Sequence, residues 1–96
     1  RRPTAIFAAN DLSAIATMEV AYNLGLTVPD DLSIIGFDNV PESALARVPL
    51  TTIMQPLQRM GFEALRLLID LIEGVERDTH VRLPTQLVHR ASTRAL

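Results

Sequence analysis

The sequence predicts an α/β fold in which helices flank a parallel sheet. Two short apolar runs, Ala5–Ala9 and Ser33–Phe37, have the length and composition of strands that are buried on both faces. A helical stretch from about Leu12 to Leu24 lies between them. The chain therefore opens with strand, helix and strand, which is the order of a βαβ unit with a right-handed crossover and two parallel strands.

The first helix has clear signals at both ends. Asn10 and Asp11 precede it, and either side chain can accept a hydrogen bond from a free backbone N–H of the first turn. Gly25 follows it as the residue that ends the helix. Its polar edge is limited to Glu19 and Asn23, so we expect burial on more than one side. One face should cover the sheet, and a second should meet another element or another chain. The apolar residues fall on two faces, Ala16, Val20 and Leu24 on one and Ala14, Ile15, Met18 and Tyr22 on the other.

Shorter signals predict the rest of the chain. Residues 40–46 have the pattern of a single helical turn, and the β-branched run 50–55 is typical of a third strand. The longest predicted helix covers residues 57–73 and ends at Gly74. Residues 81–90 then indicate an extended segment that bends at a proline.

The longest helix has more apolar surface than this chain can cover. Outside one narrow polar stripe it is almost entirely apolar, which is wider than the about 100° stripe of an ordinary surface helix. The sheet of a 96-residue chain has little room to cover such a surface. Because Arg1–Thr4 also leads directly into a strand, we expect a piece of a longer protein, or an oligomer.

Composition excludes several classes of function. The net charge of −2 and 48% hydrophobic residues indicate a globular domain without the clustered basic surface that binds nucleic acid. Without Cys, the chain has no disulfide and no thiolate nucleophile or ligand. His80 and His89 lack metal-ligand spacing, and Ser43 lies outside any nucleophile elbow. We therefore expect no metal, no cofactor and no catalytic residue. No apolar run is long enough to span a membrane.

Polar side chains follow the first two predicted strands. Asn10 and Asp11 come after the first, and Asp38 and Asn39 come after the second. Parallel strands bring both pairs to the same edge, where open α/β sheets bind their ligands. Asn supplies a donor and an acceptor, and ionised Asp supplies acceptors, so the pair suits a polyol or a nucleobase. The alternative is ordinary turn chemistry, with Asp11 capping the helix and Asn10 shaping the turn. We interpret Asp11 as structural, and Asn10 and Asp38 as binding residues.

Five blocks of the chain, in order, resemble motifs of the lactose/galactose-repressor (LacI/GalR) family of bacterial transcription regulators. The resemblance covers essentially the whole chain, with Ala91 standing where family sequences often carry Glu. The blocks are residues 4–11 with Ala14; residues 24–31, similar to "LGLxVPxD"; residues 33–39, similar to "SVVGFDD/N"; residues 49–61, similar to "PLTTxxQPxxxMG"; and residues 83–93, similar to "LPTxLVxRxST".

The resemblance implies a fold like that of the type I periplasmic sugar-binding proteins, with two α/β subdomains joined by crossing strands. Residues 1–96 would form the C-terminal part of the effector-binding domain. Residues 1–53 and 81–96 would belong to the C-terminal subdomain. Residues 54–80 would carry the helix that packs on the N-terminal subdomain.

The resemblance also implies which residues make contacts. The residues at effector-contacting positions are Asn10, Asp38 and Gln55. The residues at dimer-contacting positions are Ile15, Met18, Tyr22 and Ala46. The complete protein would be a cytoplasmic homodimer that senses a small-molecule effector, a sugar or a nucleobase-like compound. It would bind operator DNA only through an N-terminal domain outside these residues, and it would have no membrane partner.

Two alternatives remain open from the sequence. A secreted sugar-binding receptor of a transport system has the same fold, although the Leu-Thr-Thr–Gln-Pro and Arg-x-Ser-Thr blocks favour a regulator. A small α/β hydrolase that uses Asp38 is the other alternative. It is disfavoured because the chain lacks a phosphate loop, a metal-ligand set and a partnered base.

Overall fold

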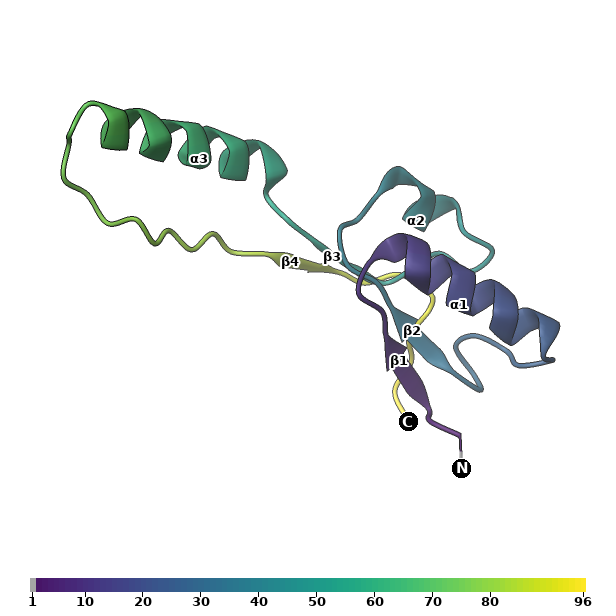
Figure 1. Ribbon diagram of the computed structural model, residues 1–96. Coiled ribbons are helices and arrows are strands. Elements are labelled where there is room, and N and C mark those ends of the chain that lie inside the picture. Colours follow the sequence, from purple (N-terminus) through teal and green to yellow (C-terminus); the bar gives the residue numbers. More distant parts are fainter. Residues whose placement is uncertain (1) are drawn as a thin grey trace. The chain divides into compact units, whose positions relative to one another are not determined.

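The computed structural model describes residues 2–96, which form two compact units (Figure 1). The first unit contains the described residues up to Met54 together with Gln86–Leu96, and the second contains Gln55–Thr85. In chain order the elements are β1 (Ala5–Phe7), α1 (Asp11–Asn23), β2 (Ser33–Ile35), α2 (Pro41–Leu45), β3 (Thr52–Met54), α3 (Leu57–Ile72) and β4 (Gln86–Val88). Elements were predicted near all of these positions, but the strands are shorter than predicted.

The first unit contains the predicted parallel sheet. β1 and β2 pair in parallel with Ile6 opposite Ile34, and Figure 1 shows the two strands side by side. Isolated parallel bridges, Ile35 to Thr51 and Asp38 to Met54, join the chain around β3 to β2 and to the turn after it. The parallel sheet predicted from the apolar runs is therefore confirmed.

The last strand pairs in a way that the sequence did not predict. β4 lies antiparallel to β3, with Ile53 opposite Leu87. The chain reverses its direction between these two strands, so their pairing is antiparallel although β1 and β2 are parallel. Within the segment predicted to be extended, Gln86–Val88 form β4, and residues 81–85 lie outside any strand.

The core of the first unit lies between α1 and the sheet. Ala14, Met18 and Ala21 project from one face of α1, at the spacing that places residues three and four apart on the same side. Met18 is 1% exposed, and its sulfur accepts a hydrogen bond from the Val48 N–H at 3.4 Å. The buried core residues are Ala8, Ala14, Met18, Ala21, Val28, Leu32, Ile34 and Leu50.

Both ends of α1 follow the expected chemistry. Asn10 is the N-cap, and its Oδ1 accepts a hydrogen bond from the Ser13 N–H at 2.8 Å. The sequence allowed Asn10 or Asp11 in this role, and the structure selects Asn10. At the other end Gly25 has φ +81°, which is the left-handed conformation of a residue that ends a helix, as predicted.

A buried hydroxyl holds the end of the chain against the sheet. Ser92 is fully buried, and its Oγ donates to the carbonyl oxygen of Ile34 in β2 and accepts from the Thr51 N–H at 2.8 Å. The Ile34 N–H in turn donates to the carbonyl oxygen of Ser92 at 2.9 Å. The Ser-Thr block near the C-terminus therefore has a structural role, because it joins β2 to the chain before β3.

The second unit consists of α3 and the chain that returns beside it. None of the residues of α3 is buried within the structure described. Arg77 holds the returning chain, because its guanidinium pairs with Asp70 at 2.8 Å and with Glu63 at 3.9 Å. The exposed apolar side chains of α3 are Leu57, Met60, Phe62, Leu65, Leu68, Ile69, Leu71 and Ile72. Within residues 2–96, the helices are too short or too polar to cross a membrane.

Candidate binding site

Asn10 and Asp38 lie at the same edge of the parallel sheet. Asn10 follows β1 and Asp38 follows β2, and these neighbouring strands run in the same direction. The two turns are joined directly, because the Asp11 N–H donates to the carbonyl oxygen of Phe37 at 3.1 Å. The geometry on which the predicted pair depends is therefore present, and contact of either residue with a ligand stays a prediction.

Asn10 is exposed and is partly engaged by its own helix. Its Oδ1 accepts the capping hydrogen bond from Ser13, which fixes the orientation of the side chain. The amide nitrogen of the same side chain is a donor that can face a ligand acceptor. Structural and binding roles are compatible in this residue, since the cap uses only the oxygen of the amide.

Asp38 and Asn39 form a turn with an unusual backbone. Their φ angles are +128° and +62°, and residues other than glycine rarely adopt positive φ. The Asp38 N–H donates to the carbonyl oxygen of Ile53 at 2.9 Å, and the Asn39 N–H donates to Thr52 Oγ1 at 3.3 Å. Strained backbone of this kind persists only where the surrounding structure enforces it, and it is concentrated at functional sites.

The side chain of Asp11 stabilises the turn that follows β2 through hydrogen bonds. Its carboxylate is fully buried, with one oxygen accepting from the Val40 N–H at 2.8 Å and the other accepting from the Thr52 hydroxyl. The prediction that Asp11 is structural is confirmed, but by a different mechanism from helix capping. Its side chain joins the start of α1 to the turn after β2 and to β3.

Arg90 holds the same turn from the C-terminal segment. Its Nη2 donates to Asn39 Oδ1 at 2.8 Å, and its Nη1 donates to Ser43 Oγ at 2.8 Å and to the carbonyl oxygen of Leu50 at 3.0 Å. In the sequence, Arg90 stands out only as part of the motif in residues 83–93. A lone arginine after a short strand gives no local signal of partners that are 40 and more residues away.

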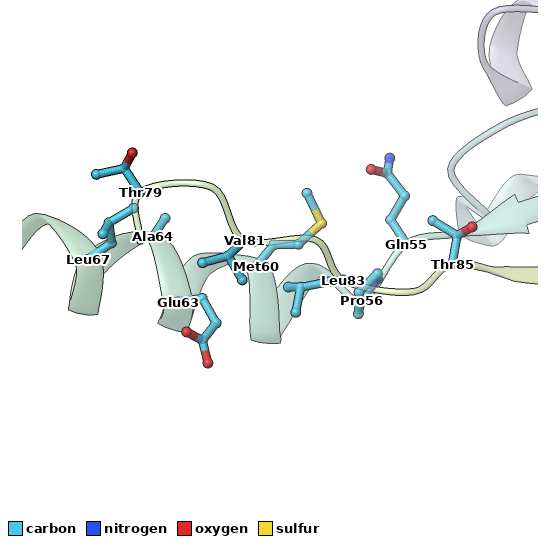
Figure 2. A pocket seen from close by; sticks show the side chains of 10 residues that line it. All are labelled: Gln55, Pro56, Met60, Glu63, Ala64, Leu67, Thr79, Val81, Leu83 and Thr85. Atoms are coloured by element: carbon cyan, nitrogen blue, oxygen red, sulfur yellow. The ribbon is translucent and has the colours of Figure 1, made fainter. Parts of the chain in front are cut away.

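Gln55, the third predicted effector residue, lies in the second compact unit. It stands at one end of a groove of about 320 Å³ between α3 and the returning chain (Figure 2). Figure 2 shows Met60, Val81 and Leu83 along the middle of the groove. Asn10 and Asp38 belong to the first unit, whereas all residues that line this groove belong to the second. The lining residues are Gln55, Pro56, Met60, Glu63, Ala64, Leu67, Thr79, Val81, Leu83 and Thr85.

The predicted dimer residues divide into buried and exposed side chains. Met18 belongs to the core of the first unit, so its side chain is not available to a second chain, and we withdraw it from the predicted dimer surface. A sequence pattern places Met18 on a helix face but does not say which face meets the sheet. Ile15 and Ala46 are half-buried, and Tyr22 is 56% exposed.

The guanidinium group of Arg47 lies over the aromatic ring of Tyr22. The guanidinium carbon of Arg47 lies 3.8 Å from the ring centroid, and Arg47 also pairs with Glu19 at 3.2 Å. The hydrogen bond to Glu19 raises the pKa of the Arg47 guanidinium. An aromatic ring, an arginine and neighbouring apolar side chains are a combination enriched at protein interfaces.

Among residues 2–96, no group of three or more His, Asp or Glu side chains is arranged to hold a metal ion. The polar side chains at the edge of the sheet are carboxylate, amide, hydroxyl and guanidinium groups that hydrogen-bond to one another and to the backbone. The chemistry that this arrangement offers is hydrogen bonding to a ligand.

Comparison with known proteins defines the class of this chain. Residues 1–93 match the family described as "Periplasmic binding protein-like domain". The chain is therefore a periplasmic binding protein-like domain, as the fold prediction stated.

The relatives define the family more closely. The HTH-type transcriptional repressor CytR of Escherichia coli is 45% identical over 95 residues, which are 98% of this chain and 28% of that protein. The lactose operon repressor of Rhizobium radiobacter is 37% identical over 93 residues, which are 97% of this chain and 82% of that sequence. The chain belongs to the LacI/GalR family of transcriptional regulators and matches their effector-binding domain. The predicted family is confirmed, and the transport receptor is disfavoured.

Solved structures agree with this assignment. The Lac repressor dimer bound to operator and the anti-inducer ONPF matches with a TM-score of 0.91 and 35% identity, over 97% of this chain and 32% of that one. The complex of the transcriptional regulator CelR with cellobiose matches with a TM-score of 0.87 and 37% identity, over 93% of this chain and 28% of that one. This chain thus spans about a third or less of the solved structures that it resembles.

Proposed function

We propose that this chain is the effector-sensing and dimerisation part of a bacterial DNA-binding transcription regulator. The effector is a small molecule, a sugar or a nucleobase-like compound. Operator DNA is contacted by another part of the complete protein, which acts in the cytoplasm as a homodimer without enzymatic activity. The observation that carries the proposal is the placement of Asn10 and Asp38 after neighbouring parallel strands, at one edge of the sheet.

The chemistry of the two side chains suits such an effector. Sugars and nucleosides present several O–H and N–H donors, and a carboxylate accepts from them with both oxygens. The amide of Asn10 adds a donor for a hydroxyl or carbonyl oxygen of the same ligand. Relatives support the ligand class, since CelR was solved with cellobiose and a LacI family regulator from Lactobacillus casei was solved with sucrose.

The proposed domain organisation explains the exposed face of α3. Residues 1–53 and 81–96 belong to the C-terminal subdomain, and residues 54–80 carry a helix that packs on the N-terminal subdomain of the complete protein. The support is that α3 has no buried residue, although it presents apolar side chains along its whole length. Gln55, carried over from the family motif, is proposed as a further effector contact.

Effector binding then acts through a shift between two conformations. A ligand can move such an equilibrium only as far as its affinities for the two states differ. In this proposal Asp38 supplies much of that difference, because a charged acceptor that meets ligand donors in one state must exchange them for water in the other. DNA affinity changes as the linked consequence.

The proposal predicts a large loss of effector affinity in the Asp38→Ala variant of the complete protein. Removal of a charged acceptor from a ligand contact weakens binding by about 10-fold to 100-fold. The effector is found first by calorimetric screening of sugars and nucleosides, and the variant is then titrated with that compound. The matched control is Asp30→Ala, which removes an exposed carboxylate from the loop before β2. Equal affinity of wild type and Asp38→Ala would refute the proposed role.

The proposed dimer surface combines Ile15, Tyr22 and Ala46 from α1 and the end of α2. Leu45, next to Ala46, adds a side chain that is 84% exposed. We expect Tyr22→Asp to weaken dimerisation of the complete protein by about tenfold or more, because it removes a large aromatic ring from the proposed interface. Sedimentation equilibrium measures the dissociation constant, with Asp30→Ala as the control. A Tyr22→Asp dimer as tight as the wild-type dimer would exclude this surface.

A further inference from the structure

We infer that Arg90 is a positioning residue for effector binding, because its guanidinium fixes the turn that presents Asp38. The inference deepens the proposed function and depends on it for the identity of the ligand contact. Its starting point is the pair of positive φ angles, +128° at Asp38 and +62° at Asn39, in residues that have a Cβ. Such a backbone relaxes to another conformation unless contacts outside the turn hold it.

The contacts that hold the turn come from distant parts of the chain. The backbone N–H groups of Asp38 and Asn39 donate to β3, at Ile53 and Thr52. Arg90 adds a contact to the side chain of Asn39, through the 2.8 Å bond from Nη2 to Oδ1. This bond restrains Asn39, the residue directly after Asp38. A rotation of the backbone at these two residues would change the direction of the Asp38 carboxylate, and the bond opposes such a rotation.

The guanidinium is well suited to this role. Its two terminal nitrogens reach three acceptors on three different segments: Asn39 in the turn, Ser43 in α2 and the carbonyl group of Leu50 before β3. Arg90 is half-buried, and hydrogen bonds from a charged donor are stronger in such surroundings. Lysine cannot replace it, because an ammonium group offers donors from a single point and not from a rigid fork.

The effect of Arg90 on binding depends on the fraction of free protein in which Asp38 has the orientation that the ligand requires. A ligand that requires one orientation of Asp38 binds with an apparent Kd that rises as the competent fraction of the free protein falls. If loss of the Arg90 bond leaves about a tenth of the molecules competent, apparent affinity falls about tenfold although every ligand contact is unchanged. A residue that only stabilised the fold would lower the melting temperature without this loss of affinity.

The test uses the complete protein and four variants. Asn39→Gly removes the acceptor of the Arg90 bond but still permits positive φ, and Arg90→Lys removes the fork. Asn39→Asp restores an acceptor at the same place and is the rescue variant, since Asp also tolerates positive φ. Ser43→Ala is the control. It deletes another partner of the same guanidinium and the long 3.4 Å hydrogen bond from the Ser43 hydroxyl to Asn39 Oδ1, and it leaves the 2.8 Å bond from Arg90 to Asn39 in place.

Affinity is measured by calorimetry with cellobiose, sucrose and free nucleosides as probes. We expect Asn39→Gly and Arg90→Lys to weaken the binding of whichever probe binds the wild type by about tenfold, and Asn39→Asp and Ser43→Ala to stay within about threefold of it. Wild-type affinity in Asn39→Gly would overturn the inference. If Asp38→Ala still loses binding in that case, the proposed function stands without it.

Crystal structures of the unliganded wild type and of the unliganded Asn39→Gly variant provide a second test, which does not need a known effector. The expected result is a changed φ at Asp38 and a displaced carboxylate in the variant. An identical turn in both structures would overturn the inference. A displaced turn together with unchanged binding in Asp38→Ala would instead refute the proposed function, and Arg90 would then position a turn without a role in effector binding.

Discussion

Asp11→Ala is expected to destabilise the 96-residue chain by about 2–5 kcal/mol, since it leaves the buried Thr52 hydroxyl and the partly buried Val40 N–H without their acceptor. The carboxylate is fully buried and accepts from the Val40 N–H and from the Thr52 hydroxyl. Alanine removes both acceptors and leaves a cavity in place of the fully buried carboxylate. Urea denaturation followed by circular dichroism measures the change in the free energy of unfolding.

Two further variants separate the hydrogen bonds from the charge. Asp11→Asn keeps an acceptor for Val40, and its amide nitrogen can donate to the Thr52 hydroxyl, which turns to accept. We expect it to cost less than Asp11→Ala. Asp30→Ala removes an exposed carboxylate and should change stability by no more than about 0.5 kcal/mol. An Asp11→Ala variant as stable as Asp30→Ala would show that Asp11 does not support the turn.

Gly36→Ala is expected to destabilise the chain by about 1–3 kcal/mol through overpacking. A Cβ at this position would lie 2.8 Å from Leu50 Cδ2 and 3.2 Å from the Cα of Asp11, and closer still to the Asp11 carboxylate. Leu50 is fully buried, and the Asp11 carboxylate is held by its two hydrogen bonds. None of these groups can move away without a loss of packing or of hydrogen bonding, so the same denaturation measurement should show the effect.

Gly61→Ala is the matched control for Gly36→Ala. Gly61 lies inside α3, and a Cβ added there has no neighbour within 4 Å. Alanine is the better helix former by about 1 kcal/mol, so this variant should be neutral or stabilising. If Gly36→Ala were as stable as Gly61→Ala, Gly36 would not lie as close to Asp11 and Leu50 as the structure shows.

The helices and the parallel strands could be predicted because their signals are local. Asn10 and Gly25 mark the ends of α1, and the short apolar runs place β1 and β2 on either side of it. The direction of the first two strands followed from the helix between them. Those elements alone place Asn10 and Asp38 at one edge of the sheet.

The features that could not be predicted depend on contacts between distant residues. Met18 was placed on the correct helix, but only the packing against the sheet shows that it faces the core. The bond from Arg90 to Asn39 joins residues 51 positions apart, and nothing in the sequence near either residue indicates it. The positive φ of Asp38 is also without a sequence signal, because the turn is imposed by β3 and not by a glycine.

A crystal structure of the complete protein with its effector bound tests the central claim most directly. The account predicts that polar atoms of the effector lie at hydrogen-bond distance, about 2.6–3.2 Å, from both the Asp38 carboxylate and the Asn10 amide. An effector that is bound elsewhere, with these two side chains in contact only with water and with their own turns, would contradict it.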